Sequence, residues 1–477
     1  MLKKVILIIS LISFVSANDY QEWLKSQNNE YTAYKKSMDE EFADMLKKDW
    51  AAFKSFSEPS PYAKPKPIKV PVVKKPVVVP QKEIKKSPIV KPIKIVKKVI
   101  KKPIVKVKKP KVIKNFKTVD FKFYSTPISI QYDKKTTFSM NKIDKKAISG
   151  FWDTISKTNF KKLIKQINTK SNNLNLNDWA KYQFIHKLGK TIYKDNNKAN
   201  LFTWFILVKM KYDTKVGYNN DKIYLLSTMQ HSLYQVSFFT LKKKRYYILT
   251  PNGKVGNVGS IFTYAGDYPK AKNKLSFTIF KEMKFYNNLK NKNLKFKYNG
   301  KKYSVNAQYS ADLIDFYKTY PQSDYNVYFS TKNSTPLSNS ILLKLAPLVK
   351  NKAEIEAVNL LLRFVQTSFK YKTDQKQFDF EKVMFPEETI FYPYSDCEDR
   401  SIMFSYLVKN LLNLDVVGVK YKDHLATAVA FSSKISGDSF KYKGTKYTIS
   451  DPTYINANAG MAMLQYKNSK FKIISLR

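Results

Sequence analysis

Three residue types that can carry out nucleophilic catalysis occur in order near the C-terminal end of this 477-residue chain. Cys397 is its only cysteine, and His424 and Asp451 follow at two equal intervals of 27 residues. A thiolate is a strong nucleophile, an imidazole can take its proton, and a carboxylate can hold the imidazole tautomer and stabilise its cation. The order predicts a triad with Cys397 as nucleophile, His424 as base and acid, and Asp451 as orienting group.

The residues after the cysteine predict a helix that begins beside it. Apolar side chains recur at helical spacing from about residue 398 to 412, at Ile402, Met403, Tyr406, Leu407 and Leu411. Asp396 is the predicted N-cap, and Asp399 three residues later completes a loose form of the capping box. Cys397 would then occupy the first helical turn, where unpaired backbone N–H groups and the helix dipole favour a thiolate.

Three strands are expected after this helix, over residues 414–419, 425–431 and 446–450. His424 stands directly before the second of these strands, and Asp451 directly after the third. A helix that leads into adjacent antiparallel strands can bring a thiol, an imidazole and a carboxylate to one place. The predicted triad is therefore compatible with the predicted local structure.

At these residues the chain resembles the transglutaminase-like (papain-like) cysteine superfamily, in a bacterial exported form. The resemblance spans roughly residues 350–460 and rests on the following features: a Cys-Glu-Asp-Arg helix start at 397–400, the histidine that opens the next strand pair, an Asp-Pro-Thr strand end at 451–453, the preceding helix 353–369, and Tyr371 and Asp374 after that helix. The resemblance implies acyl transfer by a Cys-His-Asp triad, either hydrolysis of a peptide or amide bond or transamidation onto an amine.

Plainer interpretations stand beside this one. A lone cysteine is often a small buried apolar residue, a lone histidine a core residue, and Asp-Pro a turn former. The alternative function is a non-catalytic envelope scaffold or binding protein that keeps the fold. Arg400, one of few arginines, is expected to form an ion pair with a nearby carboxylate. In the catalytic reading, the backbone N–H of Cys397 and a polar group of Tyr392 or Tyr394 would form the oxyanion hole.

Residues 1–17 predict a secretory signal peptide and a periplasmic or secreted protein. Lys3 and Lys4 precede an apolar run from Val5 to Val15, and small residues up to Ala17 provide a cleavage site. A single cysteine allows no internal disulfide, and a free thiol in an oxidising compartment is a liability unless it is used. No cofactor is expected, because the sequence contains no metal-ligand motif or phosphate-binding glycine loop.

The net charge of +49 suggests nucleic acid as a partner, but the residue types argue against specific binding. Only four of the 86 basic residues are arginines. Proteins that recognise bases and phosphates specifically favour arginine, because its forked side chain can donate two hydrogen bonds to one partner. The charge is better explained as a solvated surface that is attracted to anionic envelope polymers, chiefly through a Lys-rich linker. The expected partner is a protein or peptide substrate, and the oligomeric state is left open.

The predicted architecture is α+β with several parts. Residues 18–58 carry an aromatic stripe at helical spacing that predicts one amphipathic helix, covered by the globular part, by a partner helix in a coiled coil or by a second copy. Residues 59–117 contain 20 lysines and 11 prolines and predict a disordered linker without regular helix. The transglutaminase-like catalytic domain is expected over residues 349–477.

Residues 118–265 predict an α+β domain. A strand is expected at 119–123, a helix at 147–167 with a break near Asn159, and a second helix at 177–192. Within this domain, residues 195–253 resemble the catalytic unit at an offset of about 200, which places Asn197, Lys222 and Thr250 at the triad positions. The match indicates either an inert copy or a coincidence of short apolar runs.

Residues 266–348 predict a small β-sandwich. Asn299-Gly300 between two alternating segments is a strong hairpin signal. Further strands are expected at 275–280 and 325–330.

Overall fold

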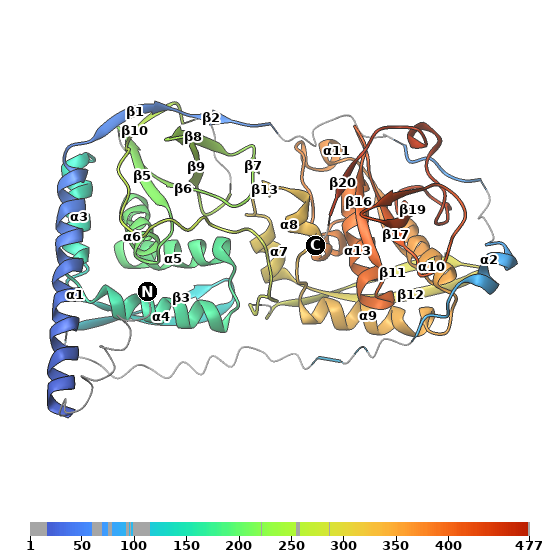
Figure 1. The fold of residues 1–477 in the computed structure, drawn as a ribbon, viewed down its shortest axis with the longest axis horizontal. Helices are drawn as coiled ribbons and strands as arrows, with labels where there is room; N and C mark the ends of the chain where they lie inside the picture. The colour runs from blue at the N-terminus through green and yellow to red at the C-terminus, as the bar shows by residue number, and fades with distance from the viewer. Residues whose placement is uncertain are drawn as a thin grey trace, which may run out of the picture.

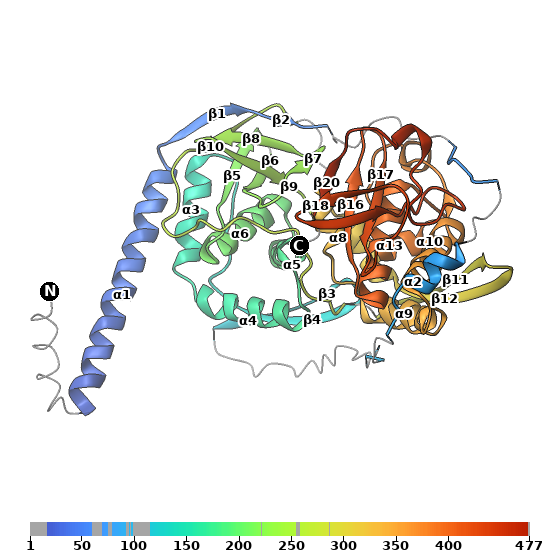
Figure 2. The same cartoon turned by 45° about the vertical axis from the view of Figure 1, so that its right-hand side comes forward.

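The computed structural model describes residues 17–59, 69–74, 79–91, 95, 97–98, 115–220, 222–253, 258–285 and 287–475. Apart from Ala17, the predicted signal peptide lies outside these residues. The fold mixes helices and sheets, which confirms the α+β class, and its two halves lie side by side (Figures 1 and 2). Among the described residues, no helix combines the length and apolar content that crossing a bilayer requires.

The N-terminal half begins with three elements that cover its edges, α1 (Ala17–Leu46), β1 (Trp50–Lys54) and β2 (Phe56–Ser57). Its body then follows in chain order: β3 (Phe116–Phe123), β4 (Thr126–Asp133), α3 (Lys145–Ser156), α4 (Phe160–Asn173), α5 (Asp178–Tyr193), α6 (Asn196–Lys209), β5 (Thr214–Asn219), β6 (Lys222–Ser227), β7 (Leu233–Tyr234), β8 (Ser237–Leu241), β9 (Lys244–Leu249) and β10 (Ser260–Tyr264).

The C-terminal half starts with a long hairpin and ends with a five-stranded sheet. Its elements are β11 (Leu289–Tyr298), β12 (Lys301–Ser310), α7 (Ala311–Tyr317), β13 (Gln322–Ser323), α8 (Tyr325–Phe329), α9 (Thr335–Val349), α10 (Glu354–Ser368), β14 (Lys370–Tyr371), α11 (Asp374–Phe378), α12 (Pro386–Phe391), β15 (Tyr394–Ser395), α13 (Cys397–Leu412), β16 (Asp415–Lys420), β17 (Leu425–Ala430), β18 (Ser439–Tyr442), β19 (Thr445–Ile449) and β20 (Lys472–Ile474).

The two halves follow the same chain path. Each has an antiparallel hairpin covered by two helices: α4 packs on β4 and α5 on β3, as α9 packs on β12 and α10 on β11. A further helix, α6 or α13, then leads into a sheet. The sheet orders correspond strand for strand, β10-β5-β6-β9-β8 in one half and β20-β16-β17-β19-β18 in the other. One supersecondary unit therefore occurs twice in this chain.

The strand register aligns individual residues of the two units. Leu226 pairs with Ile248 in the first sheet, and Ala428 pairs with Ile449 in the second. Each pair lies in an apolar cluster that contains no α-helix residue, so we treat the two pairs as equivalent. This pairing aligns Lys222 with His424 and Thr250 with Asp451, as the sequence predicted.

The helices align through a shared contact. Asn200 Nδ2 donates to the carbonyl of Ile223 at 2.7 Å, and Ser401 Oγ donates to that of Leu425 at 2.9 Å. The counterpart of Cys397 is therefore Asn196, and the prediction of Asn197 is wrong by one residue. The sequence comparison already allowed slips of one or two residues, but short apolar runs do not fix where each slip falls.

One segment has no counterpart in the first unit. Only Lys194 and Asp195 connect α5 to α6, whereas residues 369–396 lie between α10 and α13. This longer connection contains β14, α11, α12 and β15, and it ends at the N-terminus of α13. It is the main structural difference next to the predicted nucleophile.

The local predictions for residues 118–195 are confirmed. Strand 119–123 lies within β3, and the expected break near Asn159 separates α3 from α4. Asn177 caps α5, and its side chain accepts a hydrogen bond from the backbone N–H of Ala180 at 3.0 Å. These features depend on neighbours in the chain, which is why the sequence alone predicts them.

The single helix predicted over residues 18–58 is wrong in its second part. α1 ends at Leu46, and Trp50 and Phe53 belong to β1, which pairs antiparallel with β10. The aromatic stripe continues at helical spacing, but an open sheet edge offers the backbone ladder hydrogen bonds that override it. Only the C-terminal part of α1 packs on the body, since Phe42 and Leu46 are buried while Trp23 is 56% exposed.

The described parts of the predicted linker lie against the C-terminal half. Val73 N donates to the carbonyl of Ile455 at 2.9 Å, and Val90 is buried. The expectation that proline excludes helix throughout is wrong for α2 (Gln81–Lys86), which Pro80 directly precedes. Proline at a helix start removes no needed hydrogen bond, so a short helix is tolerated there.

The β-sandwich predicted over residues 266–348 is wrong. The Asn299-Gly300 hairpin is present as β11 and β12, but residues 325–329 form the helix α8, and residues 276–280 form no strand. α9 and this hairpin share a core with α10 and α13, so they belong to the C-terminal unit. Short apolar runs do not distinguish a strand from a buried helical turn.

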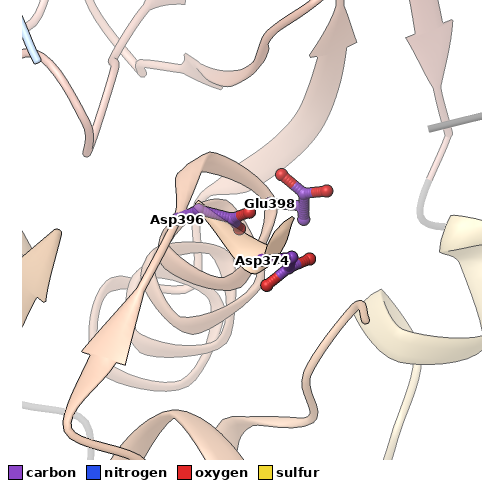
Figure 3. Close-up of side chains that lie close together, drawn as sticks. All are labelled: Asp374, Asp396 and Glu398. Atoms are coloured by element: carbon purple, nitrogen blue, oxygen red, sulfur yellow. The ribbon is translucent and has the colours of Figure 1, made fainter. Parts of the chain in front are cut away.

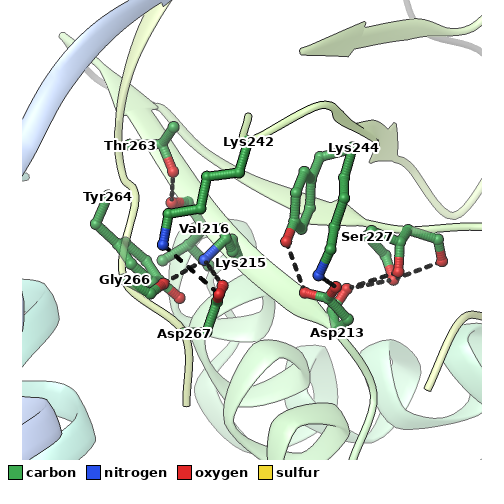
Figure 4. A network of polar contacts seen from close by, with 12 residues as sticks. Asp213, Lys215, Val216, Ser227, Lys242, Lys244, Thr263, Tyr264, Gly266 and Asp267 are labelled. Atoms are coloured by element: carbon green, nitrogen blue, oxygen red, sulfur yellow. Dashed lines mark hydrogen bonds and ion pairs between the residues drawn. The ribbon is translucent and has the colours of Figure 1, made fainter. Parts of the chain in front are cut away.

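Lysine is not confined to the surface. Lys215 on β5 is buried, donates to Asp267 at 2.7 Å, and faces the carbonyl of Gly266 (Figure 4). Burial lowers the pKa of Lys215, and the Asp267 carboxylate opposes that effect. The prediction that the positive charge is entirely a solvated surface is therefore incomplete.

Candidate active site

The predicted nucleophile lies at the first position of α13. Asp396 is the N-cap, and Asp399 completes the capping arrangement by accepting a hydrogen bond from the Asp396 backbone N–H at 3.1 Å. Cys397 is only 1% exposed. The helix start predicted from the sequence is confirmed, and it places the thiol among the orphan N–H groups of the first turn.

His424 and Asp451 are in direct contact. His424 Nε2 lies 2.8 Å from Asp451 Oδ2, and both side chains are buried. The second carboxylate oxygen, Oδ1, accepts a hydrogen bond from the Thr453 backbone N–H at 2.8 Å. An ionised carboxylate can only accept hydrogen bonds, so beside ionised Asp451 the hydrogen lies on Nε2, and in a neutral imidazole Nδ1 is then the basic nitrogen.

Nδ1 of His424 is buried and has no hydrogen-bonding partner within the described part of the chain. The helix that carries Cys397 reaches the strand after His424, because Ser401 Oγ donates to the Leu425 carbonyl at 2.9 Å. The thiol itself lies 2.9 Å from Glu398 Oε2 and donates to that carboxylate. The structure therefore joins His424 to Asp451 directly, and it ties α13, four residues after Cys397, to the strand that follows His424.

Two tyrosine rings cover the imidazole. The ring of Tyr466 is nearly parallel to that of His424 at 5.0 Å, and Tyr421 stacks on Tyr466 at 4.7 Å. The hydroxyl of Tyr466 donates to Asp423 at 3.0 Å, which fixes the ring beside the histidine. These rings stack on the imidazole of His424, and the sequence analysis did not identify them.

We expect Tyr466→Ala to slow the alkylation of Cys397 by iodoacetamide about fivefold near neutral pH, because an aromatic pair contributes about 1 kcal/mol. Tyr466→Phe keeps the ring and should react at nearly the parental rate. The pH dependence of the rate should shift in the alanine variant only. Equal rates and equal pH profiles in all three proteins would contradict a positioning role for this ring.

Three buried carboxylates gather at the start of α13, where Cys397 lies (Figure 3). Ligand atoms of Asp374, Asp396 and Glu398 all lie within 4.8 Å of one another. Their charges, together with burial, raise the pKa of the neighbouring Asp399 well above its usual range, with burial as the larger cause. Carboxylate oxygens so arranged could share a proton or hold a hard divalent cation.

The sequence analysis missed this cluster and expected no metal-binding group. The signal in the sequence was weak: Asp396 and Glu398 flank the cysteine, but Asp374 lies 22 residues earlier. Asp374 lies in the connection between α10 and α13, and the path of this connection places its carboxylate beside Asp396 and Glu398. Asp374 Oδ2 also accepts a hydrogen bond from the Lys382 backbone N–H at 2.9 Å.

Arg400 differs from its prediction. Instead of an ion pair, its guanidinium donates to the carbonyl of Phe369 at 2.7 Å and to Ser395 Oγ at 3.2 Å. Burial lowers its pKa to about 10, although Tyr371 and nearby carboxylates favour the charged form. Arg400 therefore ties the end of α10 to the start of α13.

The two tyrosines predicted near the oxyanion hole have other contacts. The ring of Tyr392 packs on Phe378 at 4.9 Å, and burial raises its pKa to about 12. Tyr394 lies in β15, with the Lys372 ammonium 5.1 Å from its ring centre. Their part in stabilising an oxyanion remains a prediction.

Glu387 is a fully buried acid in α12 whose Oε1 accepts a hydrogen bond from Ser334 Oγ at 2.6 Å. Burial raises its pKa from 4.5 to about 7. Because the folded protein binds this proton more tightly than the unfolded chain, the group favours folding at low pH. That contribution, at most about 3 kcal/mol, is lost as pH rises from 4.5 to 7.

We therefore expect Glu387→Gln to raise the free energy of unfolding at pH 8 and to leave it nearly unchanged at pH 4.5. Glutamine keeps the acceptor for Ser334 and is neutral at every pH. Denaturant titrations at both pH values would measure the difference, with the exposed Glu40→Gln as the matched control. An identical pH dependence in parent and Glu387→Gln would refute the assignment.

No protein-family model, curated protein or solved structure matches this chain. The family resemblance therefore depends on the motifs at residues 397–400, 424 and 451–453 and on the geometry described above.

Proposed function

We propose that this protein is an exported cysteine enzyme that transfers acyl groups from protein or peptide amides, by hydrolysis or transamidation. The observation that carries the proposal is the buried contact between His424 and Asp451 at 2.8 Å, which leaves the Nδ1 atom of the imidazole as a base. Cys397 supplies the nucleophile from the N-terminus of α13. The proposed fold of the C-terminal unit is transglutaminase-like.

The chemistry follows from these roles. His424 Nδ1 takes the thiol proton, and the thiolate sulfur attacks the amide carbon to form a tetrahedral oxyanion. The Cys397 backbone N–H stabilises the oxyanion, and the imidazolium returns the proton to the leaving amine as the C–N bond breaks. Water or a second amine then attacks the thioester carbon, giving up its proton to His424, and the thiol is regenerated.

In this proposal the thiol must leave Glu398. The hydrogen bond from Sγ to Oε2 keeps the proton on sulfur in the present arrangement. The reaction would start when the Cys397 side chain rotates towards Nδ1, or when the Glu398 side chain rotates away from the thiol. The carboxylate could also hold the proton transiently, and the buried acidic cluster sets how strongly it does so.

We further propose that the first unit is an inert copy of the second. At the positions of the triad it carries Asn196, Lys222 and Thr250, which offer neither nucleophilic sulfur nor imidazole. The unit also lacks a counterpart of residues 369–396. Its common path with the catalytic unit favours duplication, and its residues favour a structural or substrate-binding task.

The test is a pair of assays on the mature chain. Peptide cleavage and the incorporation of a labelled amine into a protein substrate would be measured side by side, with Cys397→Ser as the control. Either activity, lost in the serine variant, supports the enzyme and identifies the reaction. Absence of both activities across diverse protein substrates, in a folded chain, would favour the non-catalytic envelope scaffold, which the inert first unit and the projecting α1 would also suit (Figure 2).

A further inference from the structure

A cavity of about 780 Å³ is lined by residues of both halves. Most of the lining comes from the C-terminal half, at the end of β16, the start of β20 and the start of α8, and the N-terminal half adds His231 and Tyr234 at β7. Tyr421 lines this cavity, and its ring lies 6.2 Å from the imidazole of His424. The cavity therefore reaches a ring that stacks on the proposed catalytic base.

Four lysines line this cavity: Lys420, Lys422, Lys470 and Lys472. The last three are exposed, and none of the three forms an ion pair with an acid among the described residues. The only acid in the lining is Asp324, which is already held by the Tyr234 hydroxyl at 2.8 Å and by the Ser232 N–H at 3.2 Å. The cavity therefore presents unneutralised positive charge.

Between the lysines the cavity is aromatic. Phe471 is 37% exposed and packs on Tyr421 at 5.8 Å, while the ammonium of Lys420 lies 5.8 Å from the ring centre of Tyr325. An apolar floor gives a ligand buried area, and a few charges around it set its orientation. Carboxylates next to aromatic or aliphatic side chains complement this surface better than a purely charged polymer does.

A second cavity shares one lining residue with this one and is lined in part by the connection that the first unit lacks. The shared residue is Tyr234, and the second cavity, of about 550 Å³, has Phe378, Phe380 and Tyr392 among its other aromatic residues. β7 and β13 lie between the halves at this point (Figure 1). Together the two cavities offer room for an extended chain segment, with an aromatic part at one end and a basic part beside His424.

We propose that these two cavities form one groove, which binds an acidic segment of a polypeptide substrate. Lys422, Lys470 and Lys472 pair with the carboxylates of that segment, beside the amide that reacts. The inference rests on the proposed function and specifies its substrate class. It also gives the first unit a task, because His231 and Tyr234 form part of the lining. The inert copy would then be retained because it completes the wall of a substrate groove.

Binding can be measured without turnover in the full-length mature chain carrying Cys397→Ser. The probe is a fluorescein-labelled peptide that contains several Asp and Glu residues and one Phe, compared with its Asn/Gln counterpart at 0.15 M salt. Lys422→Glu, Lys470→Glu and Lys472→Glu are combined in one variant. The matched control carries the same charge change on the β3–β4 hairpin, as Lys117→Glu, Lys122→Glu and Lys134→Glu, all at exposed positions.

We expect the acidic peptide to bind more tightly than its neutral counterpart, and the groove variant to weaken it roughly tenfold. The control variant should change affinity by no more than about twofold, since distant surface charges are screened. Equal weakening in both variants would mean diffuse attraction to a basic protein and would overturn the proposal. So would equal binding of the acidic and neutral peptides.

Turnover separates this inference from the proposed function. If the active chain reacts with no amide yet binds the acidic peptide through the groove lysines, the enzyme proposal fails and the binding site stands. If the active chain processes acidic and neutral peptides with equal kcat/KM, and the groove variant does too, the enzyme stands and the groove assignment fails.

Discussion

Asp451→Asn is expected to lower turnover by about four orders of magnitude while the protein stays folded, as the same exchange does in a related triad. The geometry explains why. Thr453 N–H needs an acceptor at the Oδ1 position, so the asparagine oxygen would turn towards it. The amide NH₂ would then face His424 Nε2, which lies 2.8 Å from Oδ2 in the parent.

That orientation selects the wrong tautomer. Nε2 would have to accept a hydrogen bond, so the ring hydrogen would move to Nδ1, the atom that must take the thiol proton. The imidazolium formed during acylation would also lose its counter-charge. Turnover and melting temperature of the variant beside the parent, on a substrate found by the paired assays, would measure both effects.

The control for this experiment is Thr453→Ala, which keeps the backbone N–H and the carboxylate and should retain most activity. Near-parental turnover in a folded Asp451→Asn protein would remove Asp451 from the mechanism. It would also remove the main reason for assigning Nδ1 as the base.

Asp39→Asn is expected to reduce the free energy of unfolding at pH 7 by about 3–5 kcal/mol, the usual effect of removing one partner from a buried ion pair. The carboxylate of Asp39 on α1 pairs with the ammonium of Lys209 at the end of α6. Four aromatic rings surround that ammonium, Trp152, Phe160, Phe205 and Tyr268, with centres 4.5 to 5.3 Å away. Without Asp39 a charge would remain in this apolar setting.

The loss should depend on pH in a defined direction. Burial lowers the pKa of Lys209 to about 8, below its ordinary 10.5, even with Asp39 present. Because the folded protein binds the Lys209 proton less tightly than the unfolded chain, this group contributes stability above pH 10.5. That contribution to the free energy of unfolding is lost as the pH falls through the folded-state pKa. Without Asp39 that value falls further, so the deficit of the variant should be largest at low pH and shrink at alkaline pH.

Denaturant unfolding of three variants at pH 6 and pH 9 would test this. Asp39→Asn combined with Lys209→Met removes both charges and should recover most of the stability. Asp44→Asn, on the same helix but exposed, should leave the unfolding midpoint unchanged. If the single and double variants at Asp39 were equally unstable, packing of α1 rather than the ion pair would account for the loss.

Local features of the site followed from the sequence alone. The start of α13 at Cys397, the cap at Asp396 and the strands around His424 depend on residues a few positions apart, so periodicity and capping chemistry predict them. Only part of the duplicated path was visible: residues 195–253 resemble the catalytic unit at an offset of about 200, but the sequence left a coincidence open and did not predict the shared hairpin and its two helices. The family resemblance came from motifs of this local kind.

Other features required the tertiary structure, because they join distant parts of the chain. β1 forms where it meets the edge of β10, and α1 ends there although its aromatic pattern continues. Asp374 reaches Asp396 and Glu398 only through the path of residues 369–396. No spacing rule predicts such a contact, since the length of a loop does not determine where its ends fold back.

The sequence also does not show which lysines are buried and which are exposed. Composition correctly indicated a strongly basic protein, but Lys209 and Lys215 are buried while Lys422, Lys470 and Lys472 surround a cavity. Each lysine is alike in the sequence. What separates them is whether a carboxylate and aromatic rings from elsewhere in the chain offset the cost of removing the ammonium from water, and only the packed structure decides that.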